Sequence, residues 1–89
     1  LYAAVTRQTP DGQPPGGWSP EHRLTRAEAV LGFTAWAGEA AGVPQWGRLR
    51  SGDRADVTVF DGDPMTVAPA ELLELDVRTV IVDGRITFP

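Results

Sequence analysis

The sequence predicts an α+β fold in which one long helix precedes about three short β-strands. A capping-box sequence followed by apolar residues at helical spacing predicts the helix, over about residues 25–41. Runs of β-branched residues, the last two joined by Asp83-Gly84, predict the strands. We therefore expect a helical segment with a loop over residues 1–46 and strands over residues 47–89.

Composition limits the chain to one small domain or a segment of a larger one. It has 89 residues, 42% of them hydrophobic, with no cysteine and a net charge of −4. An acidic chain without lysine is a poor partner for nucleic acid, and no apolar run has the length of a membrane span. We expect a soluble, cytoplasmic protein. Because Leu1 lies inside an apolar run without a start signal, we also expect a fragment or processed product.

The N-terminal third combines a helix end with a long loop. Residues 1–6 are mostly apolar and suit the last turns of a helix. Seven of the eleven residues from Pro10 to Pro20 are Gly or Pro, so neither a helix nor a central strand can run through them. Pro10-Asp11-Gly12 has the composition of a tight turn.

Thr25 and Glu28 have the spacing of a capping box, which predicts a helix start. Five apolar residues then recur at helical spacing and form a stripe suited to packing. The stripe consists of Ala29, Phe33, Trp36, Ala37 and Ala40. Gly42 and Pro44 end the helix.

The second half alternates turns and strands. Leu49 is the one large apolar residue between Gly47 and Gly52, and we expect it to fill a core. Strands follow at residues 57–60, 77–82 and 85–88, and Pro69 begins one or two helical turns. Asp83-Gly84 suits a type I′ hairpin turn.

No residue set in the chain forms a competent active site, so we name no catalytic, metal-binding or cofactor-binding residue. His22 is the single histidine and cannot build a zinc site alone. Ser19 and Ser51 stand in loops without the sequence of a nucleophile elbow. Four acids surround the first strand without the spacing of a calcium loop, which favours turn formation. They are Asp53, Asp56, Asp61 and Asp63.

The order of several motifs resembles the C-terminal end of the amidohydrolase superfamily. These motifs are Gly47-x-Leu49-x-x-Gly52-Asp53-x-Ala55-Asp56, Asp63-Pro64 and Val80-x-Val82-x-Gly84-Arg85. Ala3-Ala4-Val5-Thr6-Arg7, the capping box and Asp-Pro-x-x-Val are similar to the YtcJ-like branch, amidohydrolase family 3. The resemblance covers essentially the whole chain.

The resemblance implies a metal-dependent hydrolase built as a (β/α) TIM barrel with a small composite β-sandwich. Residues 1–7 and 25–41 would belong to helices at the end of the barrel, and the strands to the sandwich. The family's metal ligands have no counterpart here, so the chain itself would hold no cofactor. A divalent metal, with zinc expected, is implied for the parent enzyme.

Two functions follow from this sequence. The first is a non-catalytic C-terminal segment of an amidohydrolase that acts on non-peptide carbon–nitrogen bonds, inactive when isolated. The second is a stand-alone binding or assembly module that uses an exposed strand edge or the apolar helix face. The expected partner is the remainder of the parent chain, or a second copy in a strand-swapped oligomer.

Overall fold

The computed structural model describes the whole chain, residues 1–89, as a helical part followed by a sheet. Its elements are α1 (Tyr2–Thr6), η1 (Pro20–His22), α2 (Arg26–Phe33), α3 (Ala35–Ala40), β1 (Val57–Phe60), η2 (Pro69–Leu73), β2 (Val77–Val82) and β3 (Arg85–Phe88), where η marks a 3₁₀ turn. The strands form one antiparallel sheet in the order β1-β2-β3. The predicted α+β class and all three strands are confirmed.

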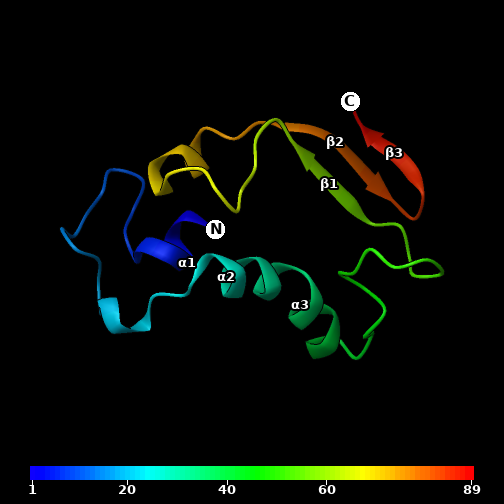
Figure 1. The fold of residues 1–89 in the computed structure, drawn as a ribbon, viewed down its shortest axis with the longest axis horizontal. Coiled ribbons are helices and arrows are strands. Elements are labelled where there is room, and N and C mark those ends of the chain that lie inside the picture. Colours follow the sequence, from blue (N-terminus) through cyan, green and yellow to red (C-terminus); the bar gives the residue numbers. More distant parts are fainter.

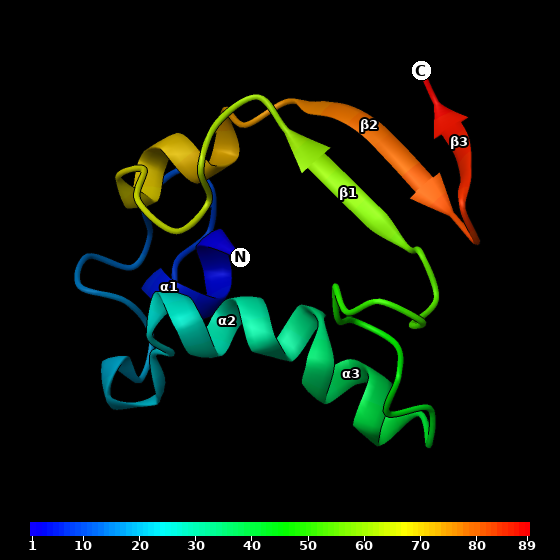
Figure 2. The same cartoon turned by 45° about the vertical axis from the view of Figure 1, so that its right-hand side comes forward.

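The elements form an open frame. Helices α2 and α3 lie in a row opposite the sheet, α1 and η2 join the two at one end, and the loop after α3 joins them at the other (Figures 1 and 2). The radius of gyration is 14.6 Å, whereas a compact domain of this length has one of about 12 Å. The frame therefore encloses much less core than a compact domain does.

Burial is confined to Ala29 and Gly38. Of the predicted apolar stripe, Ala29 is 1% exposed, but Phe33 remains 69% and Trp36 44% exposed. Leu49 is 81% exposed, so the prediction that it fills a core is wrong. Leu49 stands in the loop between α3 and β1, outside every helix and strand. Most of the stripe has no partner within these 89 residues.

The helix predicted over about residues 25–41 is not continuous, and that prediction is wrong. It breaks at Thr34, whose φ of −124° and ψ of −102° separate α2 from α3. The Thr34 hydroxyl donates a hydrogen bond to the carbonyl of Val30 at 2.7 Å. The Thr34 amide donates to the carbonyl of Leu31 at 3.1 Å, in place of the helical bond to Val30. Such back-bonding by threonine bends helices. None of the resulting helices is long and apolar enough to cross a membrane.

The predicted helix start is confirmed. The amide of Glu28 donates to the Thr25 hydroxyl at 3.2 Å, and the Thr25 amide donates to the Glu28 carboxylate at 3.1 Å. These two bonds with Thr25 lower the pKa of Glu28. The α2 start is thus fixed locally, as a capping box requires.

The predicted turns at both ends of the chain are also confirmed. The amide of Gly12 donates to the carbonyl of Thr9 at 2.9 Å, which closes the Pro10-Asp11-Gly12 turn. In the hairpin between β2 and β3, Asp83 has a φ of 51° and Gly84 of 77°, as a type I′ turn requires. The Gly84 amide donates to the carbonyl of Ala55 at 3.0 Å, so the hairpin is anchored to the segment before β1.

Gly47 packs closely against the helix break at Thr34, and this contact can be tested. A Cβ at Gly47 would overlap the backbone carbonyl of Thr34, and its φ is +72°. Gly42 has a similar φ of +76° with open space around it. We expect Gly47→Ala and Gly42→Ala each to lose about 1 kcal/mol of unfolding free energy from backbone strain, with about 1–3 kcal/mol more lost at Gly47 from the clash. The corresponding shifts of the urea midpoint, followed by circular dichroism on the full-length protein encoded around these residues, report both losses. Equal losses would show that the contact with Thr34 does not matter.

Candidate functional site

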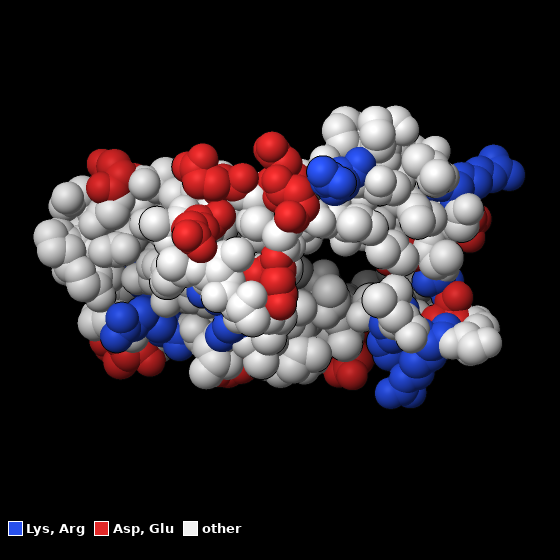
Figure 3. Space-filling model, turned by 45° about the horizontal axis from the view of Figure 1, so that its top comes forward, with Lys and Arg blue, Asp and Glu red and all other residues white.

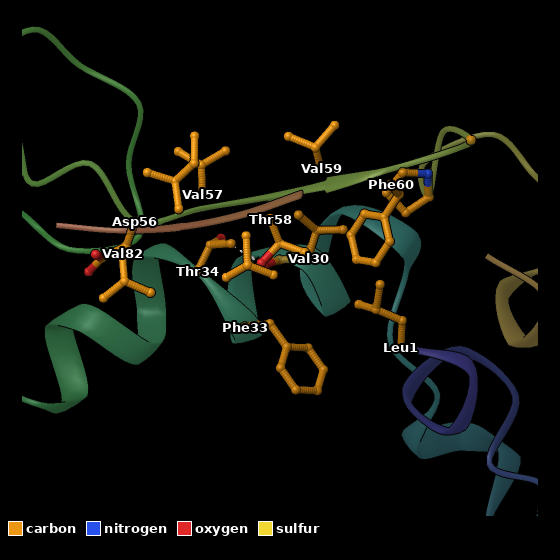
Figure 4. Close-up of a pocket in the computed structure, with 14 residues that line it drawn as sticks. Leu1, Val30, Phe33, Thr34, Asp56, Val57, Thr58, Val59, Phe60 and Val82 are labelled. Carbon is orange, nitrogen blue, oxygen red and sulfur yellow. Dashed lines mark hydrogen bonds between the residues drawn. The ribbon is translucent and has the colours of Figure 1, made fainter. Parts of the chain in front are cut away.

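The largest concave surface is a groove between α2 and the sheet. It has a volume of about 820 Å³, and nine of its fourteen lining residues are hydrophobic. The molecule is visibly hollowed in the space-filling view (Figure 3). Thr58 and Phe60 point from β1 toward α2, whereas Val57 and Val59 point away (Figure 4). Both faces of the sheet therefore carry apolar side chains, and only one of them faces the groove.

Asp56 is the single acidic residue that lines this groove. Its Oδ1 accepts hydrogen bonds from the amide of Asp83 at 2.8 Å and from the Arg54 Nε at 3.1 Å, and its Oδ2 lies 2.8 Å from the same Nε. The bond from the Asp83 amide is the main cause that lowers the pKa of Asp56. Desolvation opposes it, and the contact with Arg54 lowers the pKa further. The ionised carboxylate therefore anchors the hairpin. Because its oxygens already accept hydrogen bonds and its pKa is lowered, it is poorly suited to act as a proton acceptor.

The other acids near β1 also bind parts of the chain. Asp53 pairs with Arg48 at 3.0 Å. Asp61 Oδ1 accepts the amide of Asp76 at 3.0 Å, and Asp63 Oδ1 accepts the amide of Met65 at 2.8 Å. Of these three contacts, the one between Asp63 and Met65 lies within a turn, as predicted, whereas Asp53 forms an ion pair and Asp61 joins two separate segments. No three His, Cys, Asp or Glu side chains lie close enough together to hold a metal ion.

The histidine and the two loop serines are not brought together. His22 lies in η1 with its side chain 70% exposed, and its one charged neighbour is Glu21 at 3.8 Å. Ser19 precedes that turn with a φ of 47°. Ser51 is exposed in the loop after α3. None of these hydroxyls forms a hydrogen bond with the imidazole.

A second, smaller pocket was not predicted from the sequence. It lies between α1 and the loop that follows, and its volume is about 320 Å³. Its lining residues are Ala3, Arg7, Gln8, Thr9, Gln13, Pro14 and Trp18. The guanidinium of Arg7 stacks over the Trp18 ring, 4.9 Å from the ring centre. The one sequence feature that points to this pocket is the tryptophan directly after the Gly16-Gly17 pair. That Arg7 stacks on this tryptophan cannot be inferred from sequence spacing.

Comparison with known proteins places the chain among the amidohydrolases. The model of the family described as "Amidohydrolase family" matches residues 1–88. An N-substituted formamide deformylase of Arthrobacter pascens is 34% identical over 89 residues, which are 99% of this chain and 16% of the relative. YtcJ of Bacillus subtilis (strain 168), named only provisionally as an amidohydrolase, is 28% identical over 99% of the chain and 17% of its own length.

A third relative is the imidazolonepropionase of Myxococcus xanthus (strain DK1622). It is 39% identical over 66 residues, which are 74% of this chain and 16% of the relative. The chain thus spans about one sixth of the length of these curated relatives. No solved structure matches it.

The anchoring role of Asp56 predicts a pH dependence of stability. Because the folded state lowers the pKa of this carboxyl below its ordinary 3.8, ionised Asp56 stabilises the fold above that pH. The stabilisation is lost as the pH falls through the lowered pKa. We expect Asp56→Asn to be less stable than the parent at pH 7, and the difference to shrink below about pH 4. Urea denaturation of the full-length protein encoded around these residues measures the difference across this pH range. Asp76→Asn is the control, since the Asp76 carboxylate accepts no hydrogen bond. If the loss of stability in Asp56→Asn stayed constant with pH, the anchoring role of ionised Asp56 would be contradicted.

Proposed function

The chain belongs to the amidohydrolase family, and from this membership we propose that it is the C-terminal, non-catalytic segment of a hydrolase acting on non-peptide carbon–nitrogen bonds. The observation that carries the proposal is the match over residues 1–88 in a chain that spans about one sixth of its relatives. The names of two relatives support the bond class. One is a deformylase of N-substituted formamides and the other an imidazolonepropionase.

In this proposal the segment contributes scaffold. The row of α2 and α3 would brace the wall of a TIM barrel, and the three strands would complete a composite β-sandwich. Support comes from the apolar surfaces that the chain leaves open, since Phe33 is 69% and Ile86 68% exposed. Exposed apolar surface on this scale is typical of a face that packs against another part of a protein.

The larger enzyme would use a divalent metal, with zinc expected. The residues of this chain do not fit such an ion. A zinc site needs three or four converging His, Cys or carboxylate ligands, and no three such groups lie together here. We therefore derive no catalytic step through a metal from these residues, and we assign the chemistry to residues outside this segment.

A second candidate function is a stand-alone module that assembles through its exposed edge or helix face. The observation that favours this function is the exposed edge strand, since every residue of β3 is exposed. The two candidates differ in the partner. The first requires the rest of an amidohydrolase chain, and the second requires another protein or another copy.

The first test is enzymatic. We expect the full-length protein encoded around these residues to release formate from N-substituted formamides or to open a cyclic amide, with loss of activity on chelation and recovery with zinc. We expect residues 1–89 alone to be inactive. The control mixes the segment with the separately expressed remainder, which should restore part of the activity. Hydrolysis by residues 1–89 alone would overturn the non-catalytic assignment.

The second test concerns association. We expect residues 1–89 in isolation to self-associate or to melt without cooperativity, because few side chains are buried. Analytical ultracentrifugation with calorimetry measures both properties. Ile86→Glu should weaken association, whereas Arg85→Glu on the same strand, which changes the charge without removing apolar surface, should not. A well-folded monomer with a cooperative melt would contradict the expectation.

A further inference from the structure

The small pocket beside α1 has the features of a ligand site. Arg7 ends α1 with a φ of 58°. This is a left-handed backbone conformation, which residues other than glycine adopt at an energetic cost. From there its guanidinium turns back over Trp18. From this geometry we propose that the pocket binds a small monocarboxylate, held by the terminal nitrogens of Arg7. The proposal concerns binding and does not depend on the catalytic role of the parent enzyme.

The walls of the pocket are fixed before any ligand arrives. The Arg7 Nε donates to the Trp18 carbonyl at 2.9 Å, and the Trp18 amide donates to the Arg7 carbonyl at 2.9 Å. Gln8 Nε2 donates to the carbonyls of Gly12 and Pro14 at 3.0 and 3.1 Å. Gly17 packs so closely on Thr6 that a Cβ would overlap its carbonyl. These bonds order the loop that follows α1, whose course is traced in Figure 1.

The unpaired polar groups of the pocket include several N–H donors. The hydrogen bonds of Arg7 use its Nε, so both terminal nitrogens keep their N–H groups free. The side-chain amide of Gln13, which can both donate and accept, also forms no hydrogen bond within the chain, whereas the backbone carbonyl of Gln13 accepts from the Thr9 hydroxyl. A guanidinium presents parallel N–H groups that match the two oxygens of a carboxylate. Stacking on the Trp18 ring keeps the guanidinium plane in place.

Charge and size select the ligand class. Arg7 is the single cation among the lining residues and no acid lines the pocket, so one negative charge is balanced there. A phosphate dianion would need a second cation, and no other cation lines the pocket. A volume of about 320 Å³ is at the lower limit for small-molecule sites. Pro14 and Trp18 supply apolar surface for a short hydrocarbon or aromatic group.

The test is a calorimetric titration of the protein, in the full length that its gene encodes, with sodium benzoate. We expect saturable binding on the order of millimolar and a shift of the Trp18 indole N–H resonance. Benzamide, which has the same ring without the charge, should bind at least about tenfold more weakly, and inorganic phosphate should not shift Trp18. Equal binding of benzamide or phosphate, or no saturation with benzoate, would overturn the proposal whether or not any variant folds.

Variants assign the binding to this pocket. Arg7→Met keeps an apolar stem over Trp18 and removes the charge, and we expect at least about tenfold weaker benzoate binding. Arg23→Met is the matched control, since the Arg23 Nε also donates to a backbone carbonyl, that of Pro20 at 3.0 Å, but lies outside the pocket. Unchanged benzoate affinity in a folded Arg7→Met protein would assign the binding elsewhere and reject the site. The enzymatic test above is read from hydrolysis, so either proposal can fail without the other.

Discussion

The shortage of buried apolar surface is the constraint on which the rest of this structure depends. Folding must offset roughly 1–2 kcal/mol of backbone entropy per residue, mainly by removing apolar groups from water. Here only Ala29 and Gly38 are buried, while Val59, Ile86 and Phe33 keep two-fifths or more of their surface exposed. Polar contacts at the ends of the frame therefore have an unusually large part in holding the helical row and the sheet in place.

Those contacts are few and well defined. The Arg26 guanidinium crosses from α2 to the loop after β1 and donates to the carbonyls of Pro64 and Val67 at 2.6 and 2.9 Å. At the opposite end Arg54 stacks on Trp46, and Asp56 binds the hairpin. Each such bond contributes only about 1 kcal/mol net. Their sum is small beside the entropy of ordering the chain, which is why we expect the frame to need a further packing partner.

Local signals in the sequence predicted local structure well. Thr25 with Glu28, and Asp83 with Gly84, act within a few residues, so their geometry follows from spacing. Three features could not be predicted because they depend on contacts between distant residues. The break at Thr34 lies where Gly47 packs on its carbonyl, and Leu49 is exposed in the loop between α3 and β1. The Arg7 and Trp18 pair, eleven residues apart, is likewise created by the fold of the loop.

The Gly-x-Leu-x-x-Gly-Asp-x-Ala-Asp segment, which carried most of the resemblance, has a structural use for its last two residues. The Ala55 carbonyl and the Asp56 carboxylate bind the two turn residues of the hairpin, and this sets where β2 and β3 lie beside β1. These contacts give the last two residues of the motif a structural role. The residues with free donors and an exposed aromatic ring stand instead in the loop after α1. A ligand-related role for this segment is therefore better sought at Arg7 and Trp18 than in its signature motif.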